Sequence, residues 1–187
     1  KVAAHAENLK TILDALHAGV DSIEHGSDLN QEAIDFMKAH HVYLVPTVNV
    51  VNSIVEMTDT RFPEYMVRKG KELATKHFAS FKQALASGVM MAAGADDFYQ
   101  PDRPPGLPNE LVTDVKYGME PQQALITATT NSAALLGLDA LGALAVGKEG
   151  TLIALDGNPL TDITAVLRVR AVVKAGQVVK RPASGVR

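Results

Sequence analysis

The sequence contains no cysteine among its 187 residues and no long apolar run. The absence of cysteine excludes disulfides, thiolate metal ligands and a cysteine nucleophile. No run approaches the roughly 20 apolar residues that a membrane-spanning helix needs, and from the first residues we expect no signal peptide. We therefore expect a cytoplasmic protein, with an export compartment as the alternative that the composition leaves open.

Long runs of one charge are also absent. The chain has 18 Lys and Arg residues against 21 Asp and Glu residues, which gives a formal net charge of -3. A nucleic acid or an anionic membrane would require a concentrated basic face. Neither is therefore an expected partner.

What the chain does contain is typical of a globular protein: 47% of its residues are hydrophobic and 21% are charged. Its length fits one domain, or one domain with a small appendage. The chain begins at Lys1 without a methionine and enters an apolar strand pattern at once, with no flexible lead-in. We interpret it as the C-terminal portion of a longer protein.

Apolar runs and helical periodicity alternate through the first half of the chain. Leu9, Ile12, Leu13 and Leu16 recur at helical spacing, and Gly19 ends that pattern. Residues 49–61 read as a polar connection. The predicted strands are residues 2–4, 20–24, 42–45 and 89–93, and the predicted helices are residues 9–16, a segment capped by Asn30, and residues 63–88. Continuous apolar strands that alternate with helices indicate a parallel sheet covered by helices.

The second half of the chain has a different sequence pattern. A proline-rich loop at residues 99–108 precedes short predicted helices at 109–117, 121–129 and 132–136. From residue 151 the pattern predicts strands, with a hairpin formed by residues 169–174 and 177–180 around Ala175 and Gly176. We predict an α/β domain over residues 1–140 and a small β segment over residues 141–187.

Polar side chains follow three of the predicted strands. His5, His25 and Asp96 come after the first, second and fourth strands, and the carboxyl ends of parallel strands converge on one rim. Two imidazoles and a carboxylate are good zinc ligands. A bound divalent ion lowers the pKa of its water to about 7, and an aspartate that contacts the water can act as general base. The sequence therefore predicts a metal site for hydrolysis at this rim.

Each of these assignments has an alternative. A single histidine after an apolar run is usually a hydrogen-bonded structural residue, which is also our interpretation of His17 and His77 inside helical patterns. Asp97 directly follows Asp96 and competes with it for the catalytic position. Three loop residues could contact a substrate, although such side chains are more often only solvated: Arg61, Tyr99 and Arg103.

Several segments, in order, resemble the metal-dependent amidohydrolase superfamily, and most closely its imidazolonepropionase-like and prolidase-like branch. They are "VAAHAEN", "AGVDSIEHG", "AAGADD", "GMEPQQALITATTNSAALLGL" and the tail from "LGALAVGKEG" to "VVK". The resemblance implies a distorted (β/α)8 barrel with one or two metal ions, most often Zn2+. It implies that histidines end strands five and six and an aspartate ends strand eight, positions that fall on His5, His25 and Asp96.

The chain departs from the family pattern at its beginning. The resemblance implies a His-x-His pair after strand one and a carboxylated lysine after strand four, but these residues contain no His-x-His, and Lys1 directly precedes the strand of His5. By the resemblance, the chain holds strands five to eight of the barrel and part of a small β-sandwich domain. Such a half-barrel has open sheet edges, so we expect a homo-oligomer or pairing with the missing N-terminal half.

The resemblance implies a metal-dependent amidohydrolase that cleaves a C–N bond in a small amide, a dipeptide or a cyclic amide. The alternative is a non-catalytic half-barrel, inactive alone because the His-x-His pair and the carboxylated lysine are missing. Iron or manganese could replace zinc at such a site.

Overall fold

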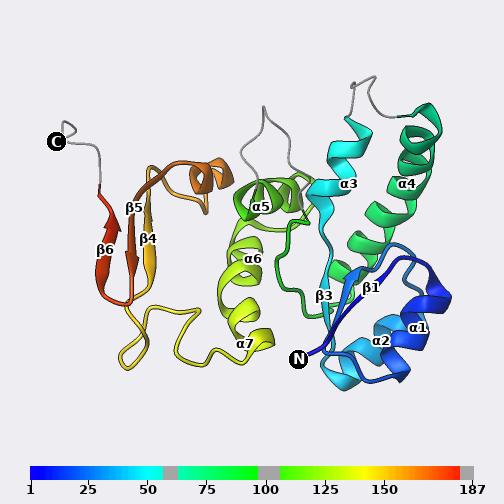
Figure 1. The fold of residues 1–187 in the computed structure, drawn as a ribbon, viewed down its shortest axis with the longest axis horizontal. Coiled ribbons are helices and arrows are strands. Elements are labelled where there is room, and N and C mark those ends of the chain that lie inside the picture. Colours follow the sequence, from blue (N-terminus) through cyan, green and yellow to red (C-terminus); the bar gives the residue numbers. More distant parts are fainter. Residues whose placement is uncertain (57–62, 97–105, 182–187) are drawn as a thin grey trace.

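The computed structural model describes residues 1–56, 63–96 and 106–181, and these residues form an elongated molecule with two separate sheets (Figure 1). A parallel sheet and the helices around it form one end of the molecule. An antiparallel sheet built from residues 152–180 forms the other end, and a helical segment lies between the two. None of the helices in the described part of the chain is long and apolar enough to cross a membrane.

The parallel sheet has the order β1-β2-β3, with β1 at Ala3–Ala6, β2 at Ser22–His25 and β3 at Tyr43–Val45. Helix α1 (Leu9–His17) connects the first two strands and α2 (Gln31–His40) connects the second to the third. Asn8 and Asn30 cap these helices by accepting the N–H groups of Thr11 and Ala33. The predicted βα alternation and the predicted cap at Asn30 are both confirmed in this region.

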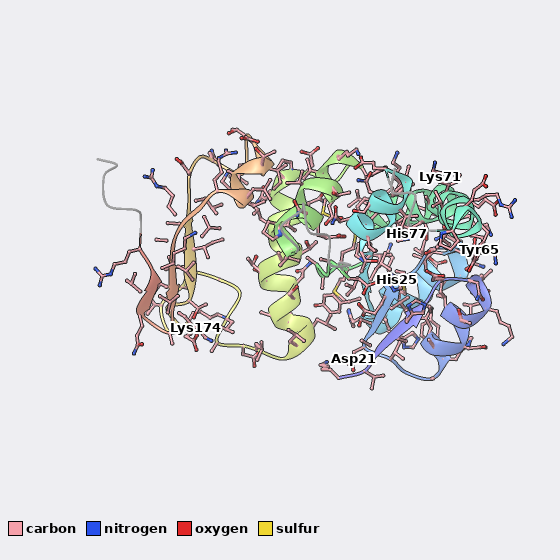
Figure 2. All side chains as sticks on the ribbon, turned by 45° about the horizontal axis from the view of Figure 1, so that its top comes forward. Asp21, His25, Tyr65, Lys71, His77 and Lys174 are labelled. Carbon is pink, nitrogen blue, oxygen red and sulfur yellow. The ribbon has the colours of Figure 1, made fainter. Side chains whose placement is uncertain are left out.

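The helix-covered face of this sheet is the centre of the core. Ile23 of β2 and Leu44 of β3 are fully buried there, together with Ile12 of α1 and Met37 of α2. Figure 2 shows the dense packing of side chains around these strands. Because side chains alternate along a strand, Ser22 and Glu24 lie on the opposite face.

The prediction of a fourth strand at residues 89–93 is wrong in its extent. This segment forms an isolated parallel bridge between Leu44 and Met91, not a strand. On its other side, the N–H of Ala93 donates to the carbonyl of Thr127, and the side-chain amide of Asn131 donates to the carbonyl of Met91. Helical groups thus take the hydrogen bonds that a further strand partner would need.

The prediction of a polar connection over residues 49–61 is also wrong for residues 49–55, which the structure shows to be helical. Residues Val48–Val55 form helix α3, which packs against the long helix α4 (Glu64–Ala86). The two helices approach closely at Gly70, where a Cβ would lie 2.3 Å from Cγ2 of Ile54. The polar residues Asn49 and Asn52 suggested a loop, but they point inward and are buried. The long helix itself matches the predicted range of 63–88.

Helices α5 (Leu107–Lys116), α6 (Pro121–Ile126) and α7 (Ser132–Leu136) follow, and a π-helical turn at Thr127–Asn131 joins the last two. The predicted helices over 121–129 and 132–136 are therefore one continuous segment. The carbonyl of Thr127 accepts hydrogen bonds from the Ser132 hydroxyl and the Ala93 N–H, which accounts for the local departure from α-helical bonding.

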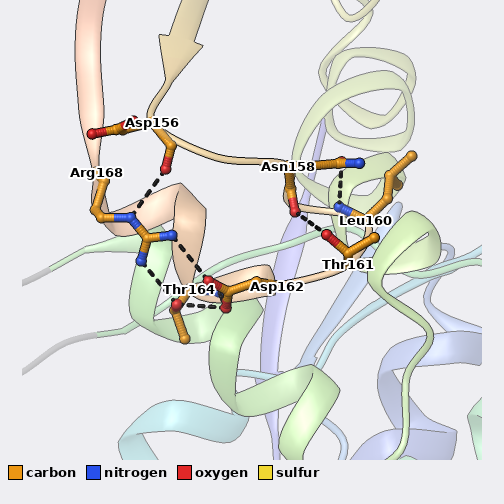
Figure 3. A network of polar contacts seen from close by, with 7 residues as sticks. All are labelled: Asp156, Asn158, Leu160, Thr161, Asp162, Thr164 and Arg168. Carbon is orange, nitrogen blue, oxygen red and sulfur yellow. Dashed lines mark hydrogen bonds and ion pairs between the residues drawn. The ribbon is translucent and has the colours of Figure 1, made fainter.

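The antiparallel sheet consists of β4 (Leu152–Leu155), β5 (Val169–Lys174) and β6 (Gln177–Lys180), as the strand and hairpin patterns predict. A 3-10 helix, η2 (Ile163–Leu167), connects this sheet to α5, and its Ile163 and Val166 join the main core. Arg168 fixes this connection by donating to the Asp156 carbonyl, the Thr164 hydroxyl and the Asp162 carboxylate (Figure 3). A domain boundary near residue 140 stays a prediction.

Helix α5 carries two buried acidic side chains, Glu110 and Asp114, which are 0% and 2% exposed. The Glu110 carboxylate accepts the N–H groups of Val48 and Asn49, at 2.5 and 2.9 Å, and so caps the N-terminus of α3. Burial raises the pKa of Asp114 to about 7, and a hydrogen bond with Glu110 opposes that shift. A carboxylate at a helix N-terminus is stabilised by the helix dipole, so the buried charge of Glu110 is compensated.

We predict that Glu110→Ala lowers the free energy of unfolding by about 3 kcal/mol, because two buried N–H groups lose their acceptor. Urea denaturation followed by circular dichroism measures this loss. Glu72→Ala on the exposed face of α4 is the control, and it should stay within about 0.5 kcal/mol of the wild type. A loss below 1 kcal/mol in Glu110→Ala would contradict the capping role.

A second prediction concerns Asp114, whose folded pKa lies above its unfolded value of 3.8. Between about pH 4 and about pH 7 the folded state binds the proton and the unfolded state does not, so this group's contribution to stability falls as the pH rises. The stability of the wild type relative to Asp114→Asn should therefore decrease across this window, by at most about 1.4 kcal/mol per pH unit. The same comparison for Asp139→Asn, at an exposed position, is the control, and an Asp114 difference no steeper than this control would refute the assignment.

Candidate metal and catalytic site

The structure brings the three predicted site residues together at the carboxyl edge of the parallel sheet. The rings of His5 in β1 and His25 at the end of β2 lie edge to face, with their centroids 4.5 Å apart. Nε2 of His25 lies 3.9 Å from Oδ2 of Asp96. The His25 side chain is 10% exposed, whereas that of Asp96 is 60% exposed. A sheltered imidazole thus faces a carboxylate that water can reach.

Backbone strain is concentrated at the same edge. His25, Thr47 and Asp96 have φ angles of 72°, 52° and 43°, and positive φ is uncommon for residues other than glycine. Such conformations persist where the surrounding structure imposes them, and they cluster at functional sites. His25 is the last residue of β2, and Thr47 and Asp96 follow β3 and the Met91 bridge, so the strain lies where the predicted site lies.

Helix α4 holds the segment that follows His25. The Ser80 hydroxyl donates to the carbonyl of Gly26 and accepts the N–H of Leu29, and the Ser27 hydroxyl contacts Nδ1 of His77 at 3.0 Å. Burial lowers the pKa of His77 to about 4, so its ring is neutral at neutral pH. A side chain at Gly26 would collide with Leu44, since its Cβ would lie 2.5 Å from Cδ1. These contacts fix the backbone that presents His25 and agree with a structural role for His77.

The electrostatics of the edge favour a neutral His25. Burial, and after it the neighbouring His5, lowers the pKa of His25, while the nearby Asp96 acts in the opposite direction. Burial raises the pKa of Glu24, and the negative charge of Asp96 adds to the effect. A neutral imidazole is the form that coordinates a metal ion.

Two residues of this edge were missed by the sequence analysis. Glu24 directly precedes His25 and accepts the Ser22 hydroxyl at 2.6 Å, on the face of the sheet opposite the helix-covered face. Oγ1 of Thr47 lies 2.7 Å from Nδ1 of His25. Thr47 comes two residues after the end of β3, and a polar residue so close behind a predicted strand was the signal available for it.

The donor types at this edge fit a zinc ion, since two imidazoles and one carboxylate are its usual oxygen and nitrogen ligands. Across the described ranges 1–56, 63–96 and 106–181, however, no group of three His, Cys, Asp or Glu side chains is close enough to form a complete metal site. His5, His25 and Asp96 therefore do not form a three-ligand metal site by themselves in this structure. Asp97 lies outside the described residues, as do the loop candidates Arg61, Tyr99 and Arg103.

The chain is similar in sequence to known hydrolases. Residues 1–179 match the model of the Amidohydrolase family. Ochratoxinase from Aspergillus niger is 31% identical over 189 residues, an alignment that covers 98% of this chain and 39% of ochratoxinase. The chain thus spans well under half the length of this curated relative.

The fold is similar to solved structures of the same kind. A Xaa-Pro dipeptidase solved with methionine in its active site superposes with a TM-score of 0.88 at 35% identity, over 96% of this chain and 44% of that one. A putative prolidase from Bifidobacterium longum superposes with a TM-score of 0.87 at 32% identity, over 100% of this chain and 48% of that one. The α/β fold predicted from the sequence is confirmed at this level, and the chain belongs to the amidohydrolase family.

Proposed function

We propose that this chain contributes His5, His25 and Asp96 to the metal site of a hydrolase that cleaves a C–N bond. The observation that carries the proposal is the convergence of these three side chains at one strained edge of the parallel sheet. Membership of the amidohydrolase family supports it. The barrel strands that the chain would supply are five to eight.

The residues take distinct roles in this proposal. His5 and His25 would hold a divalent ion, for which zinc is the first choice and iron or manganese the alternatives. The ion would supply a water molecule of lowered pKa. The exposed Asp96 carboxylate would take the proton of that water and transfer it to the leaving nitrogen. The lowered pKa of His25 keeps its ring in the coordinating form.

The substrate class follows from the relatives. The names of the Xaa-Pro dipeptidase and of ochratoxinase support a small amide or a dipeptide as substrate, with a cyclic amide as the remaining candidate. Loops after the strands select the substrate in parallel α/β enzymes.

A non-catalytic half-barrel is the second candidate. Two absences favour it. The described residues contain no three-ligand metal group, and the sequence contains no His-x-His pair. Metal content separates the two candidates directly.

We predict that the purified chain binds close to one equivalent of zinc, measured by elemental analysis after dialysis. The double variant His5→Ala/His25→Ala should lose this metal, because both nitrogen ligands are removed. His17→Ala, which changes an exposed histidine of α1, should retain it. An equal zinc content in the double variant and the wild type would count against the site. If neither protein contains zinc, the non-catalytic candidate is favoured.

Where hydrolysis of a proline dipeptide or an amide is detected, Asp96→Asn should lower kcat by about 10²- to 10⁴-fold, the usual contribution of a general base. Asp139→Asn, on an exposed turn far along the chain, should leave kcat unchanged. Asp97→Asn tests the alternative acid. A loss in Asp97→Asn without one in Asp96→Asn would reverse the assignment.

We propose, finally, that β1 pairs with another chain. β1 hydrogen-bonds to β2 along one edge, and among the described residues no strand pairs with its other edge. An open edge is a template for strand addition, by a second copy or by an N-terminal half of the barrel. Size-exclusion chromatography with light scattering should therefore give a homo-oligomer for this chain alone. A folded monomer at micromolar concentration would contradict self-association.

A further inference from the structure

We propose that Thr47 is a positioning residue that keeps the His25 ring in one tautomer, with the proton on Nδ1 and the lone pair on Nε2. This inference rests on the proposed function, because a lone pair on Nε2 matters only if that atom binds a metal ion. It adds to that function a residue that neither the sequence motifs nor the relatives assign.

The Thr47 hydroxyl has a single hydrogen and two neighbouring atoms that could accept it. Oγ1 of Thr47 lies 2.7 Å from the carbonyl oxygen of Pro46 and 2.7 Å from Nδ1 of His25. A carbonyl only accepts, so the single hydroxyl hydrogen is donated to Pro46. The contact with His25 is then satisfied only if Nδ1 carries a hydrogen and donates it to Oγ1. The reverse assignment would leave two acceptors facing each other at 2.7 Å.

The tautomer determines whether Nε2, the other ring nitrogen, carries a hydrogen or a lone pair. Nε2 of His25 faces the Asp96 carboxylate at 3.9 Å, a separation too long for a hydrogen bond. With the proton on Nδ1, the unprotonated Nε2 points toward Asp96 and lies on the same edge as His5. A histidine that binds a metal commonly donates its other N–H to an acceptor in this way, which fixes both its tautomer and its orientation.

The surroundings of Thr47 leave its hydroxyl free for this task. Thr47 occupies the N-cap position of α3, where a threonine side chain usually accepts a helix N–H, yet it makes no such bond. Instead, Glu110 accepts the first two N–H groups of α3, those of Val48 and Asn49. Thr47 itself is 2% exposed and has a φ of 52°. A distant carboxylate thus caps the helix, and the hydroxyl at its start is directed to His25.

The first test is a measurement on the unaltered chain. In the uniformly 15N-labelled, metal-free protein, two-bond nitrogen–proton correlations distinguish protonated from unprotonated ring nitrogens, and the signals that vanish in His25→Ala identify the residue. The expected pattern is a protonated Nδ1 and an unprotonated Nε2 for His25. A protonated Nε2 in the wild type would overturn the proposal, whatever the variants do.

The second test removes the hydroxyl. Thr47→Val keeps the β-branched shape at the same strained φ, and Thr47→Ser keeps the hydroxyl, so the pair separates the hydrogen bond from packing. We expect Thr47→Ser to retain the wild-type pattern and Thr47→Val to populate the Nε2–H tautomer. Retention of the Nδ1–H tautomer in a folded Thr47→Val would overturn the positioning role. If Thr47→Val does not fold, the tautomer patterns of the wild type and of Thr47→Ser test the proposal: Nδ1–H in both supports it, and Nε2–H in either contradicts it.

Zinc affinity separates this inference from the proposed function. In competition with a chelator, Thr47→Val should bind zinc about 10- to 100-fold more weakly than the wild type, and Thr47→Ser should bind it equally. If neither wild type nor variants bind zinc while the tautomers follow the expected pattern, the proposed function fails and the role of Thr47 in setting the tautomer stands. Equal zinc affinity in Thr47→Val and the wild type would overturn its role in metal binding.

Discussion

The bond between the Glu110 carboxylate and the start of α3 is the contact on which the site edge depends. It joins α5 to the segment that directly follows β3, more than 60 residues earlier in the chain. Because the carboxylate accepts the first two N–H groups of α3, the hydroxyl of Thr47 is left to contact His25. A single buried charge, compensated by a helix N-terminus, thereby links the second half of the chain to the predicted metal ligands.

The remaining support comes from α4, which approaches the same edge from the helix-covered face. Ser80 and His77 hold the backbone from Gly26 to Leu29, so His25 is fixed on one side by its own main chain and on the other by Thr47. Left-handed backbone at a residue with a side chain costs about 1 to 3 kcal/mol. The close packing at Gly26 and the two serine contacts supply the restraint that keeps this conformation in place.

Much of the first sheet could be predicted from the sequence, because its strands are short apolar runs, its helices have clear apolar periods, and Asn30 marks the start of α2. The errors arose where tertiary contacts override local pattern. Asn49 and Asn52 looked like loop residues, but they are buried against α5, where Thr113 and Lys116 contact them. The segment 89–93 looked like a strand, but helical groups occupy its second edge.

Of the site, His5, His25 and Asp96 followed from their place after the predicted strands. Glu110 could not be found, since nothing in the local sequence marks it as the cap of a helix so far away along the chain.

The buried groups around this edge are arranged so that little charge is left uncompensated. Burial holds the pKa of His77 at about 4 and raises that of Asp114 to about 7, so both are neutral between these values. Protonation of His77 below that range, or ionisation of Asp114 above it, would place an unpaired charge in the core beside the contacts that hold His25 and Thr47. His77 lowers stability as the pH falls from about 6.5 to about 4, and Asp114 lowers it as the pH rises from about 4 to about 7, so the two effects oppose each other. The ring that supports the segment after His25 is therefore neutral at neutral pH, and the carboxylates that act on His25 itself are those of Asp96 and Glu7.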